Sequence, residues 1–151
     1  MDVRLRRGGA ADAAAAADLW LRARGAAGAA IPAPVHSDEE VRAWFASHVV
    51  EALELWVAES GAGELRAILV LDGDWVDQLY VDPGWTDRGI GSRLLDAAKR
   101  ERPGGLRLWT FASNRRAQRF YERHGFVEIS RTDGAGNEER APDILYAWTR
   151  D

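Results

Sequence analysis

Residues 114–126 read NRRAQRFYERHGF, and this stretch decides the fold. Its pattern predicts a helix from Asn114 to Arg123, because Gly125 is a residue type that commonly ends helices. Asn114 and Tyr121 are seven positions apart, so both are expected on one face of this helix, two turns from each other. The helix therefore presents an amide and a phenol on the same side.

The rest of the chain alternates between two periodicities, which predicts a mixed α/β fold. Asp12 is expected to cap the first helix, and Ser37 with Glu40 forms a capping box for the second. The expected helices cover about 13–24, 38–49, 90–100 and 114–123, and the expected strands cover 3–6, 53–59, 65–71, 75–81, 106–111, 126–131 and 144–149. Their order predicts one domain over residues 1–151, with a mostly antiparallel sheet of about seven strands and about four helices.

The composition narrows the classes of function. Lys and Arg total 20 and Asp and Glu total 24, giving a net charge of −4, which argues against nucleic acid as the main partner. The chain has no cysteine and only three scattered histidines, so we expect neither a cysteine nucleophile nor a bound metal. No apolar run approaches the about 20 residues needed to span a membrane. We therefore expect a cytoplasmic protein without a membrane partner.

A second stretch, residues 86–95, reads TDRGIGSRLL and precedes a predicted helix. Backbone N–H groups at a helix N-terminus bind phosphate, and glycines let the backbone come close to it. The candidate donors are the N–H groups of Arg88, Gly89, Ile90, Gly91 and Ser92. The glycine pair alone also fits a simple tight turn. A nucleotide P-loop is weakly supported, because no Lys follows Gly91. A dinucleotide-binding motif is also weakly supported, because Leu94 stands where that motif has its third glycine.

Three motifs now stand in order along the chain: Leu79-Tyr80-Val81-Asp82-Pro83, the glycine loop, and residues 114–126. Together they resemble the GCN5-related N-acetyltransferase (GNAT) family, in the pattern L-Y-V-x-P, G-I-G with a following L-L, and N-x-x-A-x-x-F-Y-x-x-x-G-F. The order of elements fits the fold of that family over nearly the whole chain. One departure is Thr86, which stands where the family usually has Arg or Gln, and Arg88 could supply part of the missing charge.

The resemblance implies that acetyl-CoA is a cosubstrate, with its pyrophosphate on the glycine loop. It also implies that the fourth and fifth strands splay apart and that the pantetheine arm pairs with the free edge of the fourth strand. The coenzyme-binding residues expected on these grounds are Leu79, Tyr80, Val81, Arg88, Gly89, Ile90, Gly91, Ser92, Asn114 and Ala117.

The implied reaction is direct transfer of an acetyl group to a primary amine of a small molecule or peptide. Tyr121 is the candidate general acid, because a phenol of pKa about 10 can protonate a thiolate of pKa about 8.5. The base is left open between Asp77 on the fourth strand and the loop acids. The loop acids are Glu138, Glu139 and Asp143. Of all these carboxylates, we select Asp77 and Glu139 as the two candidate catalytic bases. The alternative role for Tyr121 is packing in the core, and the alternative for the acids is that they are solvated charges without a catalytic role.

The acceptor is less defined than the coenzyme. Trp109 lies on the fifth strand near the expected splay, and an aromatic wall beside acidic groups suits a cation. Members of the family often dimerise, so a homodimer is also open. The alternative function is a non-catalytic acyl-CoA-binding or sensing module with the same fold, which is favoured by Thr86 and by the absence of an unambiguous base.

Overall fold

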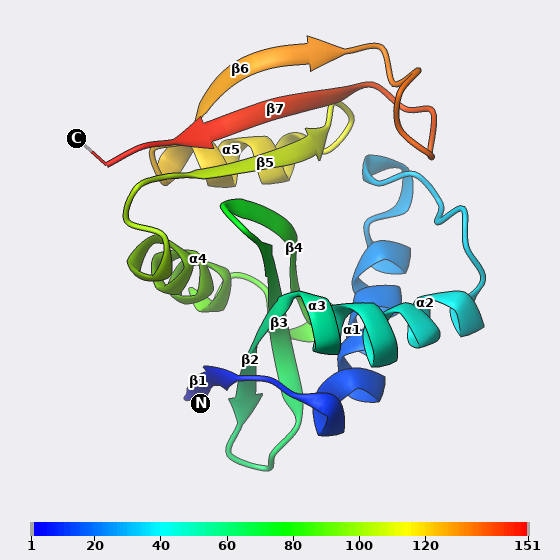
Figure 1. The fold of residues 1–151 in the computed structure, drawn as a ribbon, viewed down its shortest axis with the longest axis vertical. Helices are drawn as coiled ribbons and strands as arrows, with labels where there is room; N and C mark the ends of the chain where they lie inside the picture. Colours follow the sequence, from blue (N-terminus) through cyan, green and yellow to red (C-terminus); the bar gives the residue numbers. More distant parts are fainter. Residues whose placement is uncertain (1, 151) are drawn as a thin grey trace.

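The computed structural model describes residues 2–150, in which seven strands form one sheet (Figure 1). The strand order is β1-β2-β3-β4-β5-β7-β6, and every neighbouring pair is antiparallel except β4 with β5. The strands are β1 (Val3–Arg7), β2 (Glu54–Ser60), β3 (Leu65–Asp72), β4 (Trp75–Val81), β5 (Leu106–Phe111), β6 (Val127–Thr132) and β7 (Asp143–Trp148). The predicted mixed α/β fold with a mostly antiparallel sheet is confirmed.

Helices cover both faces of this sheet (Figure 1). One face packs against α1 (Ala13–Ala26) and the second helical segment, which consists of α2 (Asp38–Trp44), η3 (Phe45–Val49) and α3 (Val50–Ala52). The other face packs against α4 (Ile90–Glu101) and α5 (Arg115–Arg123). Short 3₁₀ turns lie at η1 (Ala10–Asp12), η2 (Gly28–Ala30) and η4 (Pro83–Trp85). All four predicted helices are therefore present.

The central strand β3 is apolar on both sides because it is buried between the two layers. Ile68 and Val70 belong to the core beneath α1 and η3, whereas Leu69 and Leu71 belong to the core beneath α4. All four side chains are fully or almost fully buried. A strand covered on both faces has a continuous apolar sequence instead of an alternating one, as residues 67–71 have.

Two local predictions need correction. The Asp12 side chain does not cap α1: it accepts a hydrogen bond from the Gly9 backbone N–H at 2.8 Å and pairs with Arg6 at 2.8 Å, so it closes η1 instead. The second helix is also not regular throughout, because a π-helical turn occupies Phe45–Val49. Its predicted capping box is confirmed, since Ser37 and Glu40 exchange both hydrogen bonds.

The parallel pair β4 and β5 is joined at a single register position, Trp75 with Arg107. Beyond it the strands diverge, as the resemblance to the GNAT family implies (Figure 1). β4 also contains a bulge: Val70 pairs with Gln78 and Leu71 with Val76, which leaves Asp77 as the extra residue. Bulges commonly redirect a side chain beside a functional site. The divergence leaves backbone N–H and C=O groups of both strands without a ladder partner.

No helix within residues 2–150 is both long enough and apolar enough to cross a membrane.

Candidate active site

A groove of about 770 Å³ runs from the start of α4 to the gap between β4 and β5. Its walls come from α5, from β4 and from the end of α1 with the loop that follows. Nine of the predicted coenzyme-binding residues line it, namely Leu79, Tyr80, Val81, Gly89, Ile90, Gly91, Ser92, Asn114 and Ala117. The tenth, Arg88, belongs to the same loop but is not among the residues that line the groove. The three sequence motifs thus meet in one groove.

The glycine loop directs backbone donors into this groove. Gly89 caps α4 in the left-handed region with φ 79°, which a glycine adopts without strain. A Cβ at Gly91 would lie 3.5 Å from both Phe120 and Val81, so the backbone there is close to its neighbours. The first N–H groups of a helix have no intrahelical partner, and here they belong to Ile90, Gly91 and Ser92. The loop has the form of an anion site.

The cationic side chain of Arg88, within the loop, lies against an aromatic ring. The Arg88 guanidinium lies 4.7 Å from the centre of Trp85, whose ring also contacts Arg66 at 4.5 Å. Thr86, the residue that departs from the family pattern, donates from its hydroxyl to the Pro83 carbonyl at 3.4 Å. Trp85 therefore orients Arg88, while Thr86 stabilises the turn and adds no charge.

Asn114 and Tyr121, which the sequence predicts on one face of the helix, both line the groove. Asn114 caps the helix, and its side-chain oxygen accepts a hydrogen bond from the Ala117 N–H at 3.2 Å. Tyr121 is only 8% exposed, and this burial, together with the nearby Tyr80 phenol, raises its pKa. The phenol therefore keeps its proton at neutral pH, which is the state that a proton donor requires.

A smaller cavity of about 90 Å³ lies between β4 and β5 and joins the groove. Six residues line both spaces, namely Ile31, Leu79, Tyr80, Asn114, Ala117 and Tyr121. The glycine loop lines only the groove, so the small cavity is the end furthest from the anion site. Asp77, Trp109 and Thr110 line only the small cavity. A ligand bound along the whole groove would place its far end beside Tyr121 and these three residues.

Asp77 is the acid that the structure brings to this cavity. Its side chain is exposed, yet the surrounding protein removes part of its hydration, and this partial desolvation raises its pKa, with Asp72 adding to the effect. Gln78 opposes the shift by donating a hydrogen bond to the carboxylate at 3.2 Å. A carboxylate with a raised pKa is a better proton acceptor than an ordinary one.

The loop acids are engaged elsewhere. Glu139 pairs with the buried Arg24 at 3.6 Å, and Glu138 contacts His36 at 3.0 Å. Asp143 is buried and accepts hydrogen bonds from Thr132 and from Asn137. None of these three carboxylates lines the groove or the small cavity. Geometry therefore favours Asp77 over the loop acids as the base.

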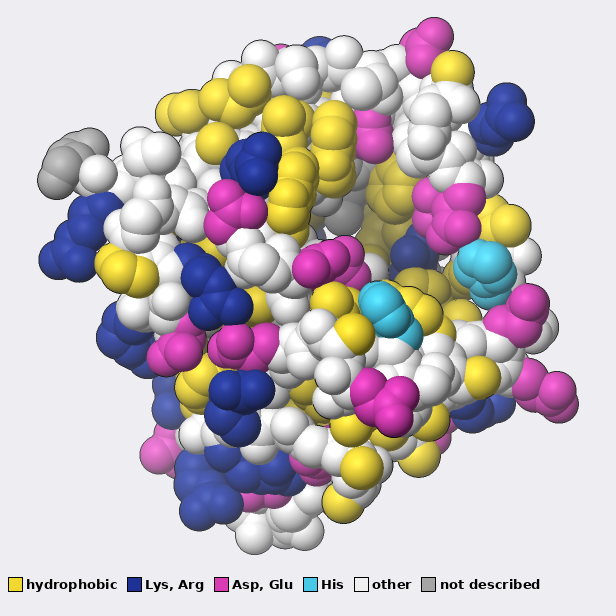
Figure 2. Space-filling model, viewed as in Figure 1, with side chains coloured by type: hydrophobic (Ala, Val, Ile, Leu, Met, Phe, Trp, Pro, Cys, Tyr) yellow, Lys and Arg dark blue, Asp and Glu magenta, His cyan; other side chains and the backbone are white. Residues whose placement is uncertain are grey.

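The wall opposite α5 is aromatic. Trp109 is 46% exposed and stacks on Trp75, with ring centres 6.4 Å apart and planes 6° from parallel. Figure 2 shows this face hollowed beside hydrophobic side chains, with acidic and histidine side chains at its rim. Trp20 contributes differently, because it is buried and donates to Gln78 at 2.9 Å. Trp109 thus stands beside the small cavity that Asp77 also lines.

Thr110 is a site residue that the sequence-based assignment did not include. It follows Leu106 and Leu108 on the buried face of β5, where alternation predicts another apolar residue. A polar residue at a position where the pattern predicts burial was the feature of the sequence that could have identified Thr110 as a site residue.

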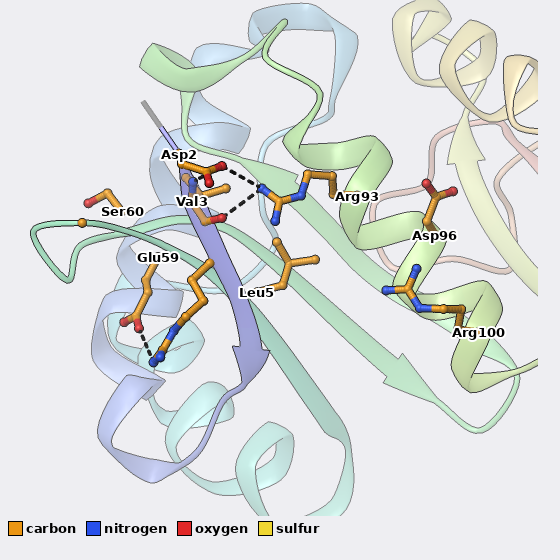
Figure 3. Close-up of a pocket in the computed structure, with 10 residues that line it drawn as sticks. Asp2, Val3, Leu5, Glu59, Ser60, Arg93, Asp96 and Arg100 are labelled. Carbon is orange, nitrogen blue, oxygen red and sulfur yellow. Dashed lines mark hydrogen bonds and ion pairs between the residues drawn. The ribbon is translucent and has the colours of Figure 1, made fainter.

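Another hollow, of about 780 Å³, lies between β1 and α4, outside the groove (Figure 3). Several of its charged side chains pair with neighbouring groups: Arg93 contacts the Val3 carbonyl at 2.9 Å and Asp2 at 3.6 Å, and Arg4 pairs with Glu59 at 3.0 Å. It contains none of the predicted site residues. Within residues 2–150, no group of three His, Cys, Asp or Glu side chains is placed to hold a metal ion.

Comparisons with known proteins identify the family of the chain. A model of the acetyltransferase (GNAT) domain matches residues 51–128, and the chain belongs to this family. The peptidyl-lysine N-acetyltransferase YjaB of Salmonella typhimurium is 31% identical over 94 residues. That alignment covers 61% of this chain and 64% of YjaB, so the chain spans less than two thirds of this relative.

Solved structures show the same fold over a larger share of the chain. The solution structure of apo YjaB from Escherichia coli has a TM-score of 0.78 at 22% identity, with 98% of both chains covered. The PaiA N-acetyltransferase of Thermoplasma acidophilum, solved in complex with coenzyme A, has a TM-score of 0.74 at 18% identity, covering 99% of this chain and 100% of that chain. The fold expected from the three motifs is confirmed.

Proposed function

We propose that the protein is an acetyl-CoA-dependent N-acetyltransferase that transfers the acetyl group directly to a primary amine of a small molecule or peptide. The observation that carries this proposal is the groove that joins the glycine loop to the splayed strands, with Tyr121 in its wall. Membership of the family supports it, as does the coenzyme A bound to the PaiA neighbour. We also propose that residues 1–151 act as one domain, since strands from both ends of the described chain share one sheet.

Each part of the groove has a role in this proposal. The N–H groups of Gly89, Gly91 and Ser92 bind the pyrophosphate, and the free backbone edge of Leu79 to Val81 binds the pantetheine arm. Ser92 also has its hydroxyl 3.0 Å from His124, which fixes its side chain beside the loop. The amine acceptor enters from the side of Trp109 and Asp77, where an aromatic ring and a carboxylate together attract a cation.

Two residues move protons in the proposed reaction. Asp77 takes a proton from the ammonium group, directly or through water, because a protonated amine of pKa about 10.4 cannot attack. Asp77 passes this first proton on to solvent. The amine nitrogen then bonds to the carbonyl carbon and loses its second proton to solvent water, while the C–S bond breaks and its electron pair goes to the sulfur. Tyr121 donates its proton to that sulfur and is reprotonated from solvent. The products are an acetamide and coenzyme A.

The test combines binding and turnover. Purified protein is mixed with acetyl-CoA and a panel of amines (spermidine, kanamycin, tryptamine and a lysine-containing peptide), and free thiol is followed with time. We expect thiol release with at least one amine, and an increase in melting temperature with CoA alone, because CoA binds the native state selectively. A melting temperature that rises with CoA but no turnover on any amine would instead identify a binding module.

The Arg88→Ala variant tests the charge that compensates for Thr86. We expect its dissociation constant for CoA to rise about fivefold to tenfold, because one charge-assisted contact with phosphate is lost in an exposed setting. The difference should shrink as salt is added, since exposed charges are screened. Titration calorimetry at two salt concentrations measures both effects, and Arg100→Ala, on the other side of α4 in the hollow of Figure 3, is the matched control. Unchanged affinity in Arg88→Ala would mean that the backbone donors suffice.

A further inference from the structure

Thr110 is a polar residue buried without a partner. Its side chain is 6% exposed, and its Oγ1 has no hydrogen-bond partner within residues 2–150. A buried hydroxyl without a partner destabilises a folded protein, whereas valine has almost the same shape and carries no such penalty. The position on β5 therefore suits valine better than threonine as far as folding alone is concerned.

The surroundings of Thr110 suggest what its hydroxyl is for. Thr110 and Tyr121 line the same small cavity between β4 and β5, which is the end of the groove furthest from the glycine loop. A coenzyme whose phosphates lie on the loop places its other end, the thioester, in this cavity. The Thr110 hydroxyl has no partner among the described residues, so an acceptor atom brought into this cavity can satisfy it.

We propose that the Thr110 hydroxyl donates a hydrogen bond to the sulfur of the coenzyme as the thiolate leaves. This inference rests on the proposed function, since it requires acyl-CoA in the groove. The hydrogen bond strengthens as the C–S bond breaks and the electron pair collects on sulfur, because bonds to charged acceptors are stronger than bonds to neutral ones. Tyr121 transfers its proton to the same sulfur, and Thr110 keeps its own. Thr110 thus stabilises the charge that Tyr121 then neutralises.

The chain offers a matched control. Ser60 is also 6% exposed and also has an unpartnered hydroxyl, but it lies at the end of β2 in the hollow shown in Figure 3, away from the groove. Thr110→Val and Ser60→Ala both remove a buried hydroxyl without a partner. Both should melt at or above the temperature of the wild type, and only Thr110→Val should affect the chemistry.

The first readout is steady-state kinetics with acetyl-CoA and the fastest amine of the panel. We expect Thr110→Val to lower kcat about tenfold to hundredfold, which corresponds to one hydrogen bond to a charged group. The KM for acetyl-CoA should change less than about twofold, because the bond matters most in the transition state. Thr110→Ser keeps the hydroxyl and should restore most of the rate. Thr110→Ala replaces Thr110→Val if the latter fails to fold.

The second readout needs no acceptor. Thiolate absorbance in the ultraviolet gives the pKa of the thiol of bound CoA, and a donor beside the sulfur lowers that pKa. We expect it to be higher by about one unit or more in Thr110→Val, and unchanged in Ser60→Ala. Wild-type kcat and thiol pKa in Thr110→Val would overturn the inference, as would a raised KM with unchanged kcat, which places Thr110 on another part of the coenzyme.

The two readouts also separate this inference from the proposed function. If no amine is acetylated but the thiol pKa still depends on Thr110, the proposed function fails and the contact with sulfur stands. If the wild type acetylates an amine and Thr110→Val behaves as Ser60→Ala does, only the inference fails. A protein that binds no CoA would contradict both.

Discussion

The Tyr121→Phe variant should acetylate its amine about 100-fold more slowly than the wild type, with unchanged affinity for CoA. The substitution removes the proton donor and keeps the ring, so packing against Phe120 and Phe126 is preserved. General acid catalysis contributes about 100-fold to 10,000-fold in enzymes. Burial raises the pKa of this phenol, so the wild type should not lose activity through Tyr121 ionisation as the pH rises from 7 to 9.

A second tyrosine provides the control for this experiment. Tyr146 is fully buried in the same core, and its hydroxyl donates to Glu122 at 2.8 Å, outside the groove. Tyr146→Phe should lower the free energy of unfolding by about 1 kcal/mol and leave kcat unchanged. If Tyr121→Phe and Tyr146→Phe have equal rates, Tyr121 is a packing residue and the proton comes from elsewhere.

The Asp77→Asn variant should also lose about 100-fold in kcat/KM near neutral pH, because the amide cannot accept a proton from the amine. The direction in which the rate changes with pH follows from the charge that Asp77 must carry. Asp77 acts as a base only when ionised, so the wild-type rate should rise as the pH increases through its pKa, which lies above the ordinary value of about 3.9. The ratio of wild-type to variant rates should therefore fall as the pH decreases. Rate profiles from pH 4 to 9 measure this ratio.

The Glu139→Gln variant tests whether Glu139, the other candidate, is the base instead of Asp77. Glu139 pairs with Arg24, and both side chains are largely buried. Removing one partner of a buried pair leaves the other uncompensated, so we expect a lower melting temperature and an unchanged rate for each folded molecule. If Glu139→Gln slows the reaction at full stability while Asp77→Asn does not, the base is Glu139.

The parts of the fold that depend on local patterns could be predicted closely. The bounds expected for residues 75–81 and 106–111 agree with β4 and β5, because short apolar segments bordered by turn residues define strands well. The groove could be placed from three motifs, since their residues belong to elements that the fold brings side by side. The membership of Asn114 and Tyr121 in one helix face needed only the helical period.

Most of the features that were missed depend on distant parts of the chain. The bulge at Asp77 follows from the pairing of β4 with β3, and the partner of Glu139 lies on α1. Asp12 contacts Gly9 and Arg6, which precede it in the chain, instead of capping α1, which follows it. The local sequence is compatible with either arrangement. The absence of a partner for Thr110 is visible only in three dimensions, because a sequence does not show which buried hydroxyls are satisfied.

The single pairing of Trp75 with Arg107 divides the sheet at one point of the chain. Strands β1 to β4 come from residues before 82, and strands β5 to β7 come from residues after 105. Each half therefore assembles from its own contiguous segment, and the backbone ladder between them is almost missing. A coenzyme that pairs with the edge of β4 and contacts α5 would act as a removable strand that joins the two halves. Amide hydrogens of β4 and β5 should exchange with solvent more slowly once the coenzyme is bound. Binding of the coenzyme would then also stabilise the contact between the two halves of the sheet.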